Sequence, residues 1–246
     1  MNEKKLTVII PVYNGEKHLK QCLDSIIKTN YKKIITYIID DGSTDNTKKI
    51  CDFYNKKYSS VFKYYYKPNG GVSSARNYGI DKVYTEFVMF VDADDYLNFE
   101  SFFEIFEKNS NYDLFLGGFT KFQTDSMKVE RFECFNLKSS ISAFMQNPNN
   151  WLSPPYLLSP WSKVFKTRII KEYNIKFPIN VEYGEDVIFV FNYLMKANTI
   201  CCIKEAGYYY RKNNNSLSTN FKSNIFVSDM KRYSNYRRTI RKIKHQ

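Results

Sequence analysis

The chain has 246 residues, a formal net charge of +12 and 43% hydrophobic residues. This length and apolar fraction suffice for one large α/β domain, or for one domain with a helical appendage. Only two histidines occur, His18 and His245, which nearly excludes histidine-based metal sites, Ser-His triads and Cys-His nucleophiles. Acid–base chemistry must therefore come from carboxylates, lysine or tyrosine.

The five cysteines are odd in number and include no Cys-x-x-Cys pair. This pattern predicts thiols that pack as small hydrophobic groups in a reducing compartment. The apolar run that begins at Leu6 is interrupted by Pro11 and is too short for a signal peptide. No run approaches the roughly 18 apolar residues that span a bilayer. We therefore expect a cytoplasmic protein, either soluble or attached to the inner face of the cytoplasmic membrane.

The first hundred residues alternate between strand and helix patterns. Apolar runs predict four strands, at Leu6–Val12, Ile34–Ile39, Val61–Tyr66 and Phe87–Val91. Three helices are predicted between them: one follows Leu19, one is capped by Ser43 or Thr44, and one spans Val72–Val83. Strands that alternate with helices of this length predict an α/β fold with a mostly parallel central sheet flanked by helices.

Beyond Phe99 the pattern is less regular. It predicts a helix over 99–108, a strand over 114–119, an extended pair within 120–135, a loop over 147–160, a helix from Glu185 and a strand over 199–210. No internal repeat or linker separates these segments. We therefore predict a single domain over residues 1–221, with halves that divide at residue 100.

Residues 222–246 carry eight basic side chains against one acid, Asp229. Apolar residues recur among them at helical spacing, which predicts a basic amphipathic helix at the C-terminus. Such a helix suits an anionic membrane surface, to which each basic residue contributes roughly 1 kcal/mol. It would equally suit a terminal helix that packs on its own domain and solvates its charges.

The segment after Phe87–Val91 is the most informative in the chain, because a buried strand leads directly into three carboxylates. Asp92 and Asp94 are two residues apart, and such residues on an extended chain project to the same side. Two like charges held together are unfavourable unless a cation lies between them. A divalent metal that holds a phosphorylated substrate therefore explains the segment better than a solvated acidic turn does, although Asp-x-Asp alone is too common to decide.

Polar or glycine-rich segments follow all four predicted strands, where ligands bind in open α/β sheets. Together they resemble the family 2 glycosyltransferases, in an order and spacing similar to the nucleotide-binding half of the GT-A fold. The matching segments are Val8–Asn14, Asp40–Asp45, Asn69–Asn77 and Val91–Asp95. The strong similarity covers residues 5 to 100 and a weaker one continues to residue 220. The resemblance implies a nucleotide-sugar-binding half over 1–100 and an acceptor half over 101–221.

The same resemblance implies a nucleotide-sugar donor, expected to be a UDP-sugar, and the residues that bind it: Pro11, Tyr13, Asp41, Arg76, Asp92, Ala93 and Asp94. In this arrangement the Tyr13 ring stacks on the nucleobase and Asp41 accepts the imino hydrogen of uracil. Arg76 makes a charge-assisted contact on the nucleotide side. Ordinary packing, a turn and a solvated helical arginine are the respective structural alternatives.

The implied cofactor is Mn²⁺ or Mg²⁺, held by Asp94, with Asp92 on the metal or the ribose and Asp95 as a supporting hydrogen-bond acceptor. These hard cations prefer oxygen ligands and would neutralise the nucleoside diphosphate as it leaves. Arg211 lies where relatives often place groups near the diphosphate, sometimes including a histidine, which this region of the chain lacks, and we expect Arg211 to supply positive charge instead.

Glu185 and Asp186 precede an amphipathic helix and resemble the acidic motif of the family, which implies that Asp186 is the base and Glu185 its neighbour. A helix N-terminus favours an ionised carboxylate, so we expect Asp186 to be deprotonated near neutral pH. Acidic residues are common in first helical turns for structural reasons alone. Trp161, in Trp-Ser-Lys, resembles a segment of surface-polysaccharide enzymes and could stack on an acceptor sugar, though large aromatic residues also simply pack.

The chain is thus identified as resembling an inverting, metal-dependent glycosyltransferase of surface polysaccharide synthesis, such as that of capsule or lipooligosaccharide. It would transfer a hexose or N-acetylhexosamine to a glycan or lipid-linked glycan, with no nucleic-acid partner. The alternatives are a sugar-nucleotide nucleotidyltransferase and a non-catalytic binder of anionic membrane or nucleic acid. The first usually has a glycine-rich phosphate loop where this chain reads Pro11-Val12-Tyr13-Asn14.

Overall fold

The computed structural model describes residues 4–29, 31–98, 100–123, 128–132, 137–146, 159–181 and 184–212. The chain divides into a unit of residues 1–211 and a second unit of residues 212–246, and all described helices and strands belong to the first. The predicted boundary at residue 221 and the predicted basic helix over 222–246 lie outside the described residues.

The four strands predicted in the first half are confirmed as β1 (Leu6–Val12), β2 (Ile34–Asp40), β3 (Phe62–Tyr66) and β4 (Phe87–Phe90). They are parallel, with β1 hydrogen-bonded to both β2 and β4, and β3 beside β2. Every residue of β1, β2 and β4 is buried, as expected for strands covered by helices on both faces.

Three helices connect these strands: α1 (Leu19–Lys28), α2 (Thr47–Lys57) and α3 (Val72–Lys82). The predicted cap of α2 at Ser43 or Thr44 is wrong, because the helix begins at Thr47. The Ser43 hydroxyl instead accepts a hydrogen bond from the Asn14 backbone at 2.9 Å, and the Thr47 N–H donates to Asp45 at 2.9 Å. The polar turn after β2 therefore contacts the turn after β1 before the helix starts.

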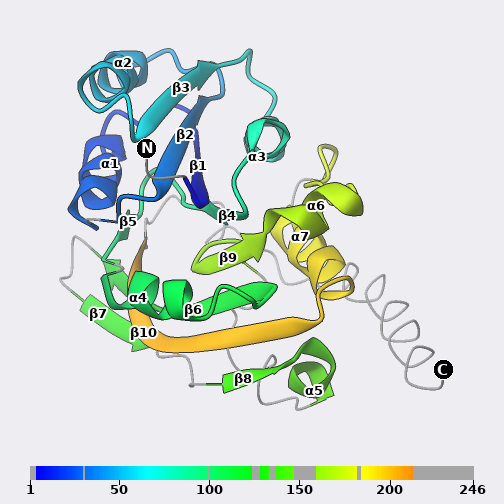
Figure 1. The fold of residues 1–246 in the computed structure, drawn as a ribbon. Coiled ribbons are helices and arrows are strands. Elements are labelled where there is room, and N and C mark those ends of the chain that lie inside the picture. Colours follow the sequence, from blue (N-terminus) through cyan, green and yellow to red (C-terminus); the bar gives the residue numbers. More distant parts are fainter. Residues whose placement is uncertain are drawn as a thin grey trace. The chain divides into compact units, whose positions relative to one another are not determined.

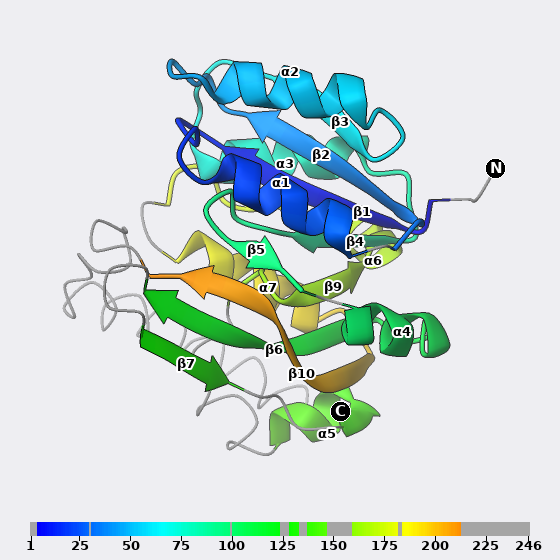
Figure 2. The ribbon, with the colours of Figure 1, turned by 90° about the vertical axis from the view of Figure 1, so that its left-hand side faces the viewer.

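The helices lie on both faces of the sheet. In Figure 1, α1 and α2 are on one side of β1 and β2, and α3 is on the other. Figure 2 shows the same arrangement from the side, with α1 and α2 in front of the strands and α3 behind them. The predicted α/β fold, a central sheet flanked by helices, is confirmed.

The second half extends the sheet with strands of both directions. The long strands β6 (Leu114–Gln123) and β10 (Thr199–Arg211) are parallel to each other, and β9 (Lys163–Lys166) lies antiparallel between β4 and β6. The sheet order is β3-β2-β1-β4-β9-β6-β10-β5, where β5 is Tyr96–Leu97. In Figure 2 the arrowheads of β2, β6 and β10 point the same way, whereas those of β7 and β9 point back.

Smaller elements complete the second half. The expected helices near 99–108 and from Glu185 are confirmed as α4 (Glu100–Lys108) and α7 (Glu185–Leu194). The expected extended pair is confirmed between β6 and β7 (Lys128–Phe132), which are antiparallel. Most of the predicted loop over 147–160 lies outside the described residues. The remaining elements were not predicted: β8 (Leu137–Ser140), α5 (Ile141–Gln146), β9 and α6 (Thr167–Glu172).

Aromatic rings from both halves form the core behind the end of β4. The Phe90 ring lies edge-on to Phe165, Phe177 and Phe189, with ring centroids 5.2–5.9 Å apart. Phe177 and Phe189 stack at 4.0 Å, so the segment before α7 is packed against α7 itself. The four described cysteines, Cys22, Cys51, Cys201 and Cys202, are buried, as expected for thiols that pack as small hydrophobic groups. Within the described residues, no helix has the length and apolar character required to cross a membrane.

Candidate functional site

The segments after β1, β2, β3 and β4 meet at the carboxyl ends of the parallel strands. The loop after β1 is attached to the loop after β2: the Gly15 N–H donates to Thr47 Oγ1 at 2.8 Å, and the Thr44 N–H donates to Asn14 Oδ1 at 2.8 Å. Ligands of open α/β sheets bind outside this edge. The predicted convergence of polar segments is therefore present.

Asp41, which follows β2, is a buried hydrogen-bond acceptor at this edge of the sheet. Its carboxylate accepts hydrogen bonds from the backbone N–H groups of Gly70, at 3.1 Å, and Gly71, at 2.7 Å, and from the Lys67 ammonium. Gly71 has φ of +84°, a backbone conformation that favours glycine, so a residue with a Cβ would be strained at this position. Lys67 carries no motif of its own and was not predicted.

The neighbouring carboxylate has a different environment, and the structure thereby separates the two aspartates after β2. Asp40 is fully buried and accepts hydrogen bonds from the Ser43 N–H at 2.8 Å and the Tyr64 hydroxyl at 2.9 Å. It stabilises the turn and β3, whereas Asp41 faces the segment after β3. Of the two aspartates, Asp41 is therefore the one placed toward the segment after β3, and it is the one predicted to accept the imino hydrogen of uracil.

An exposed aromatic ring lies on the loop beside this acceptor. Tyr13 is 54% exposed, so the structure leaves its ring accessible to a ligand. Pro11 is buried within β1, paired with Ile39 of β2, and shapes the strand end through its backbone. Ala93 is partly buried and packs against the core. These three positions border the edge without presenting a charged group to it.

Arg76 of α3 lies between carboxylates from two different parts of the chain. Its Nη2 donates to Asp92 Oδ1 at 2.9 Å, and its Nη1 donates to Asp186 Oδ1 at 2.6 Å. Glu185 Oε1 is 3.7 Å from the same Nη1. The guanidinium thus joins the acidic segment after β4 to the start of α7, residues that are 94 positions apart in the chain (186 − 92).

The predicted base has a raised pKa. Burial raises the pKa of Asp186 to about 7, against the lowering effect of the Arg76 charge, while Glu185 and Asp92 raise it further. The expectation of a fully ionised carboxylate near neutral pH took account of the helix N-terminus and not of this burial. A pKa close to the operating pH is the one that suits a general base.

Asp95 anchors the acidic segment from inside the protein. Its carboxylate accepts hydrogen bonds from the Tyr208 hydroxyl at 2.6 Å and the Arg211 N–H at 2.7 Å. The same Tyr208 oxygen accepts the Asp92 N–H at 3.2 Å. Burial, followed by the charges of Asp92 and Asp94, raises the pKa of Asp95 well above its usual range. Asp95 thus accepts hydrogen bonds within the protein, and its expected supporting role at the site stays a prediction.

Arg211 reaches the acidic segment from the end of β10. Its Nε donates to the Asp94 carbonyl oxygen at 2.8 Å, and its Nη2 donates to Gln21 Oε1 at 2.5 Å. The guanidinium lies over the Phe122 ring, 4.6 Å from the centroid. Arg211 therefore brings positive charge next to Asp94, where we expected a substitute for the missing histidine.

Trp161 lies under β10. It is 9% exposed and stacks on Tyr208, with ring centroids 5.1 Å apart, and on Tyr210, at 5.4 Å. The Trp161 ring is thus packed among protein rings, which is the structural alternative weighed for it. Next to it, Ser162 has φ of +54° and donates from its hydroxyl to Gly118 O at 2.9 Å, which fixes this turn to β6.

Asp92 and Asp94 are the candidate metal ligands. Both are partly exposed at the strand end and offer only oxygen donors. Within the described residues no group of three or more His, Cys, Asp or Glu side chains is arranged to hold a metal ion. Mg²⁺ usually binds through one or two carboxylates together with substrate phosphates, so this donor set fits a hard cation that arrives with a diphosphate.

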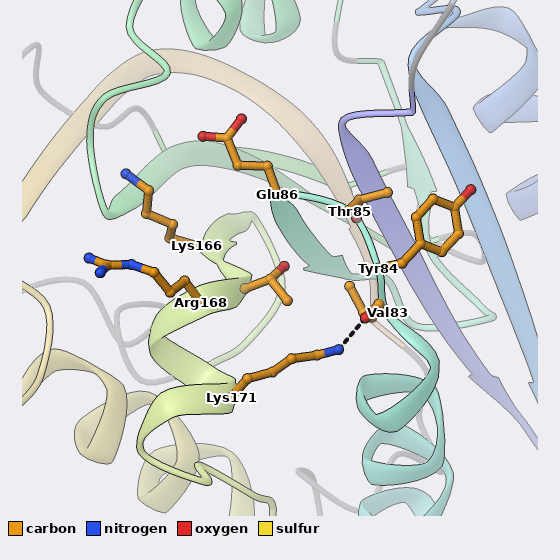
Figure 3. Close-up of a pocket in the computed structure, with 8 residues that line it drawn as sticks. Val83, Tyr84, Thr85, Glu86, Lys166, Arg168 and Lys171 are labelled. Atoms are coloured by element: carbon orange, nitrogen blue, oxygen red, sulfur yellow. Dashed lines mark hydrogen bonds between the residues drawn. The ribbon is translucent and has the colours of Figure 1, made fainter. Parts of the chain in front are cut away.

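A separate pocket lies at the amino end of β4, away from these residues. Figure 3 shows its lining from two segments, Val83–Glu86 before β4 and the end of β9 with α6. The Lys171 ammonium donates to the Val83 carbonyl, and the Thr167 N–H donates to Glu86 O at 2.9 Å. None of the predicted site residues lines this pocket.

Comparisons with known proteins show the family to which the sequence is similar. The sequence profile described as "Glycosyl transferase family 2" matches residues 7–182, which is more than half of the chain. The chain is 32% identical over 215 residues to the poly(ribitol-phosphate) beta-glucosyltransferase of Bacillus spizizenii, covering 84% of this chain and 32% of that protein. It is 29% identical over 225 residues to glycosyltransferase GlyA of Streptococcus pneumoniae, covering 88% of this chain and 32% of that protein. The chain therefore spans about a third of the length of these relatives.

Solved structures give the same result. The fold is similar to that of S. aureus TarS 1–349 in complex with UDP-GlcNAc, with a TM-score of 0.70 and 26% identity over 89% of this chain and 61% of that chain. A mannosyltransferase from Pyrobaculum calidifontis, solved with GDP-Man and Mn²⁺, matches with a TM-score of 0.61 and 14% identity over 88% of this chain and 59% of that chain. The second likeness shows the fold alone.

Proposed function

This chain belongs to glycosyltransferase family 2, and we propose that it transfers a hexose or N-acetylhexosamine from a UDP-sugar to a hydroxyl group of a glycan or lipid-linked glycan, with inversion at the anomeric carbon. The observation that carries the proposal is the Arg76 contact, which holds the strand-end Asp92 and the helix-start Asp186 at one place. Because the chain belongs to this family, we no longer propose a nucleotidyltransferase or a non-catalytic binder.

Asp186 acts as the base in the proposed reaction. Its carboxylate takes the proton of the acceptor hydroxyl while the hydroxyl oxygen bonds to the anomeric carbon. The bond from that carbon to the diphosphate breaks on the opposite side, and UDP leaves with the electron pair. Since one displacement forms the product, its anomeric configuration is inverted and no covalent enzyme intermediate forms.

The donor half is proposed to hold the UDP part. Tyr13 would stack on uracil, Asp41 would accept its imino hydrogen, and Asp92 with Asp94 would hold Mn²⁺ or Mg²⁺. The ion, when bound, would neutralise the negative charge that develops on the diphosphate. The contact between Arg211 and the Asp94 backbone supports a further positive charge beside the leaving group.

We propose surface polysaccharide synthesis as the setting. The relatives whose names state an acceptor act on poly(ribitol-phosphate), an anionic polymer. A formal net charge of +12 suits such an acceptor or an anionic membrane that carries it. Removal of residues 222–246 is expected to weaken binding to liposomes with anionic lipids and to spare activity on a soluble acceptor. Unchanged binding to these liposomes would reject the membrane role at the inner face of the cytoplasmic membrane.

A donor panel tests the function directly. Hydrolysis of UDP-glucose, UDP-galactose and their N-acetylated forms, with GDP-mannose for comparison, is measured with Mn²⁺ and with EDTA. We expect release of UDP from one donor in Mn²⁺, and loss of that release with EDTA. No turnover of any nucleotide sugar, with or without an acceptor, would refute the proposal.

A further inference from the structure

Arg76 is a buried cation whose environment is more specific than a nucleotide contact requires. Its side chain is 4% exposed, and its two terminal nitrogens bond to Asp92 and Asp186. The guanidinium carbon lies 5.1 Å from the centroid of the Phe177 ring. Its Nε is buried without a hydrogen-bond partner in the described structure. Burial of such a charge is costly unless close partners compensate it, and here both partners are residues of the candidate site.

The Asp186 carboxylate depends on this contact. Among the described residues, Arg76 is its hydrogen-bond donor, and the α7 N-cap residue, Gly184, is in the left-handed region with φ of +88°. Helix α7 supplies the backbone position of Asp186, while the direction of the carboxylate is set by a side chain from α3. The ring under Arg76 belongs to the same assembly, since Phe177 stacks on Phe189 of α7.

We propose that Arg76 is a positioning residue, which orients the Asp186 carboxylate and keeps it in a fixed relation to Asp92. This inference rests on the proposed function, in which Asp186 is the base. A planar guanidinium donates to two carboxylates at once, whereas an ammonium is a single point charge on a flexible stem. Arg76→Lys therefore keeps the charge and loses the bridge between the two carboxylates.

A double-mutant cycle separates this role from a contact with the donor. The enzymes compared are wild type, Arg76→Lys, Asp186→Asn and the double variant, with kcat and KM for transfer measured alongside the Kd for UDP. We expect Arg76→Lys to lower kcat by about 10²-fold, because a 1 Å misplacement of a catalytic group has an effect of this order. In the Asp186→Asn background the same change should alter kcat by less than about threefold, because residues that act as a unit are non-additive.

The controls address folding. Lys171→Met removes a comparable long-range bond, to Val83 O in the pocket of Figure 3, and should lower the Tm while kcat stays at the wild-type value. If Arg76→Lys does not fold, Phe177→Leu removes the ring under the guanidinium. We expect that variant to lower kcat by about threefold to tenfold in the wild-type background and not in Asp186→Asn.

The outcomes are distinguishable. If Arg76→Lys lowers kcat by the same factor in both backgrounds, Arg76 does not act through Asp186 and the inference is overturned. An unchanged kcat in Arg76→Lys overturns it as well. If Asp186→Asn itself retains wild-type transfer, the assignment of the base in the proposed function has failed instead.

Discussion

The two halves of the molecule hold their site residues in different ways. In residues 6–98 the candidate side chains follow strands directly and are fixed by nearby backbone, as when the N–H groups of Gly70 and Gly71 donate to Asp41. In the second half they lie on a helix and on the end of a long strand. There they are fixed by contacts that return to the first half, Asp186 through Arg76 and Arg211 through the Asp94 carbonyl.

This difference indicates that the two halves contribute to the site in different ways. In the proposed donor half, Asp41 is held by groups of the same half, whereas the acidic segment after β4 is also anchored by Tyr208 and Arg211 of β10. In the proposed acceptor half, Asp186 and Arg211 are oriented by contacts with residues of the first half. Substitution of Asp186 should therefore affect catalysis alone. Substitutions in the first half should affect donor binding and, through Arg76, catalysis as well, and Arg211, beside the proposed leaving group, should also affect donor binding.

The largest effect is expected at Asp186. Asp186→Asn removes the base and keeps the size of the side chain, so kcat should fall by roughly 10²- to 10⁴-fold. The Kd for UDP, measured by calorimetry, should stay within about twofold, because the donor residues are fixed in the other half. Glu185→Gln, one residue earlier on α7, is the matched control. A larger loss in Glu185→Gln than in Asp186→Asn would transfer the role of base to Glu185.

The metal ligands should show the opposite pattern. Asp94→Ala is expected to weaken Mn²⁺-dependent binding of UDP by about 10²-fold, since a metal contributes several kcal/mol to charge stabilisation. Binding measured in EDTA should be equally weak in the variant and in wild type. Retention of the Mn²⁺ effect in Asp94→Ala would show that other oxygen atoms hold the ion.

Substitution of Asp41, the proposed acceptor for uracil, should give a smaller loss, which is confined to binding of UDP. Asp41→Asn removes a charged acceptor, and hydrogen bonds to charged groups contribute about 1.5–3 kcal/mol, so the Kd for UDP should rise about 10- to 10²-fold. Asp45→Asn is the control in the same loop, because Asp45 accepts hydrogen bonds from the N–H groups of Glu16 at 3.1 Å and Thr47 at 2.9 Å and has no proposed contact with the donor. Equal losses in the two variants would indicate a general disturbance of the loop.

The pH profile should report the burial of Asp186. The base works in its ionised form, and its pKa is raised to about 7, so kcat/KM should fall as the pH drops through that value. The expected slope below about pH 7 is tenfold per unit, with a plateau above it. Asp186→Asn should lose this acidic limb. A limb that persists in the variant would belong to another group.

The sequence predicted more of the first half than of the second. The reason is again whether the structure depends on local signals or on contacts between distant residues. The four parallel strands and the residues after them were predictable because buried runs and turn residues are local signals, and the parallel order brings their ends together. The distinct environments of Asp40 and Asp41 were not, since they depend on Tyr64 and on the glycines after β3.

In the second half, the important contacts join residues far apart in the chain. The bridge from Arg76 to Asp186 spans 110 residues, and that from Arg211 to Asp94 spans 117. Both contacts depend on the sheet order, in which β9 and β6 lie between β4 and β10. Because β9 has only four residues, it is too short for a periodic pattern to predict it. A buried lysine such as Lys163, whose Nζ donates to the Ser159 carbonyl at 2.6 Å, is likewise invisible to pattern analysis.

The smallest effect is expected for a small shift of α3, and it tests whether such a shift changes kcat. A Cβ at Gly79 would lie 2.7 Å from Ile9 Cγ2 of β1, so Gly79→Ala must displace the Ile9 side chain, α3 or the strand. Overpacking costs about 1–3 kcal/mol and the gain in helix propensity returns about 1 kcal/mol, which leaves a net loss of roughly 1 kcal/mol. The Tm should fall by about 2–4 °C, as measured by calorimetry. Because Arg76 is on the same helix, kcat should fall as well, while Asp81→Ala, which removes only an exposed ion pair of α3 with Lys176, should change both quantities little. A lower Tm with unchanged kcat would show that the Arg76 bridge tolerates a shift of its helix, and the proposed dependence of the acceptor half on the donor half would then be weaker than the static contacts indicate.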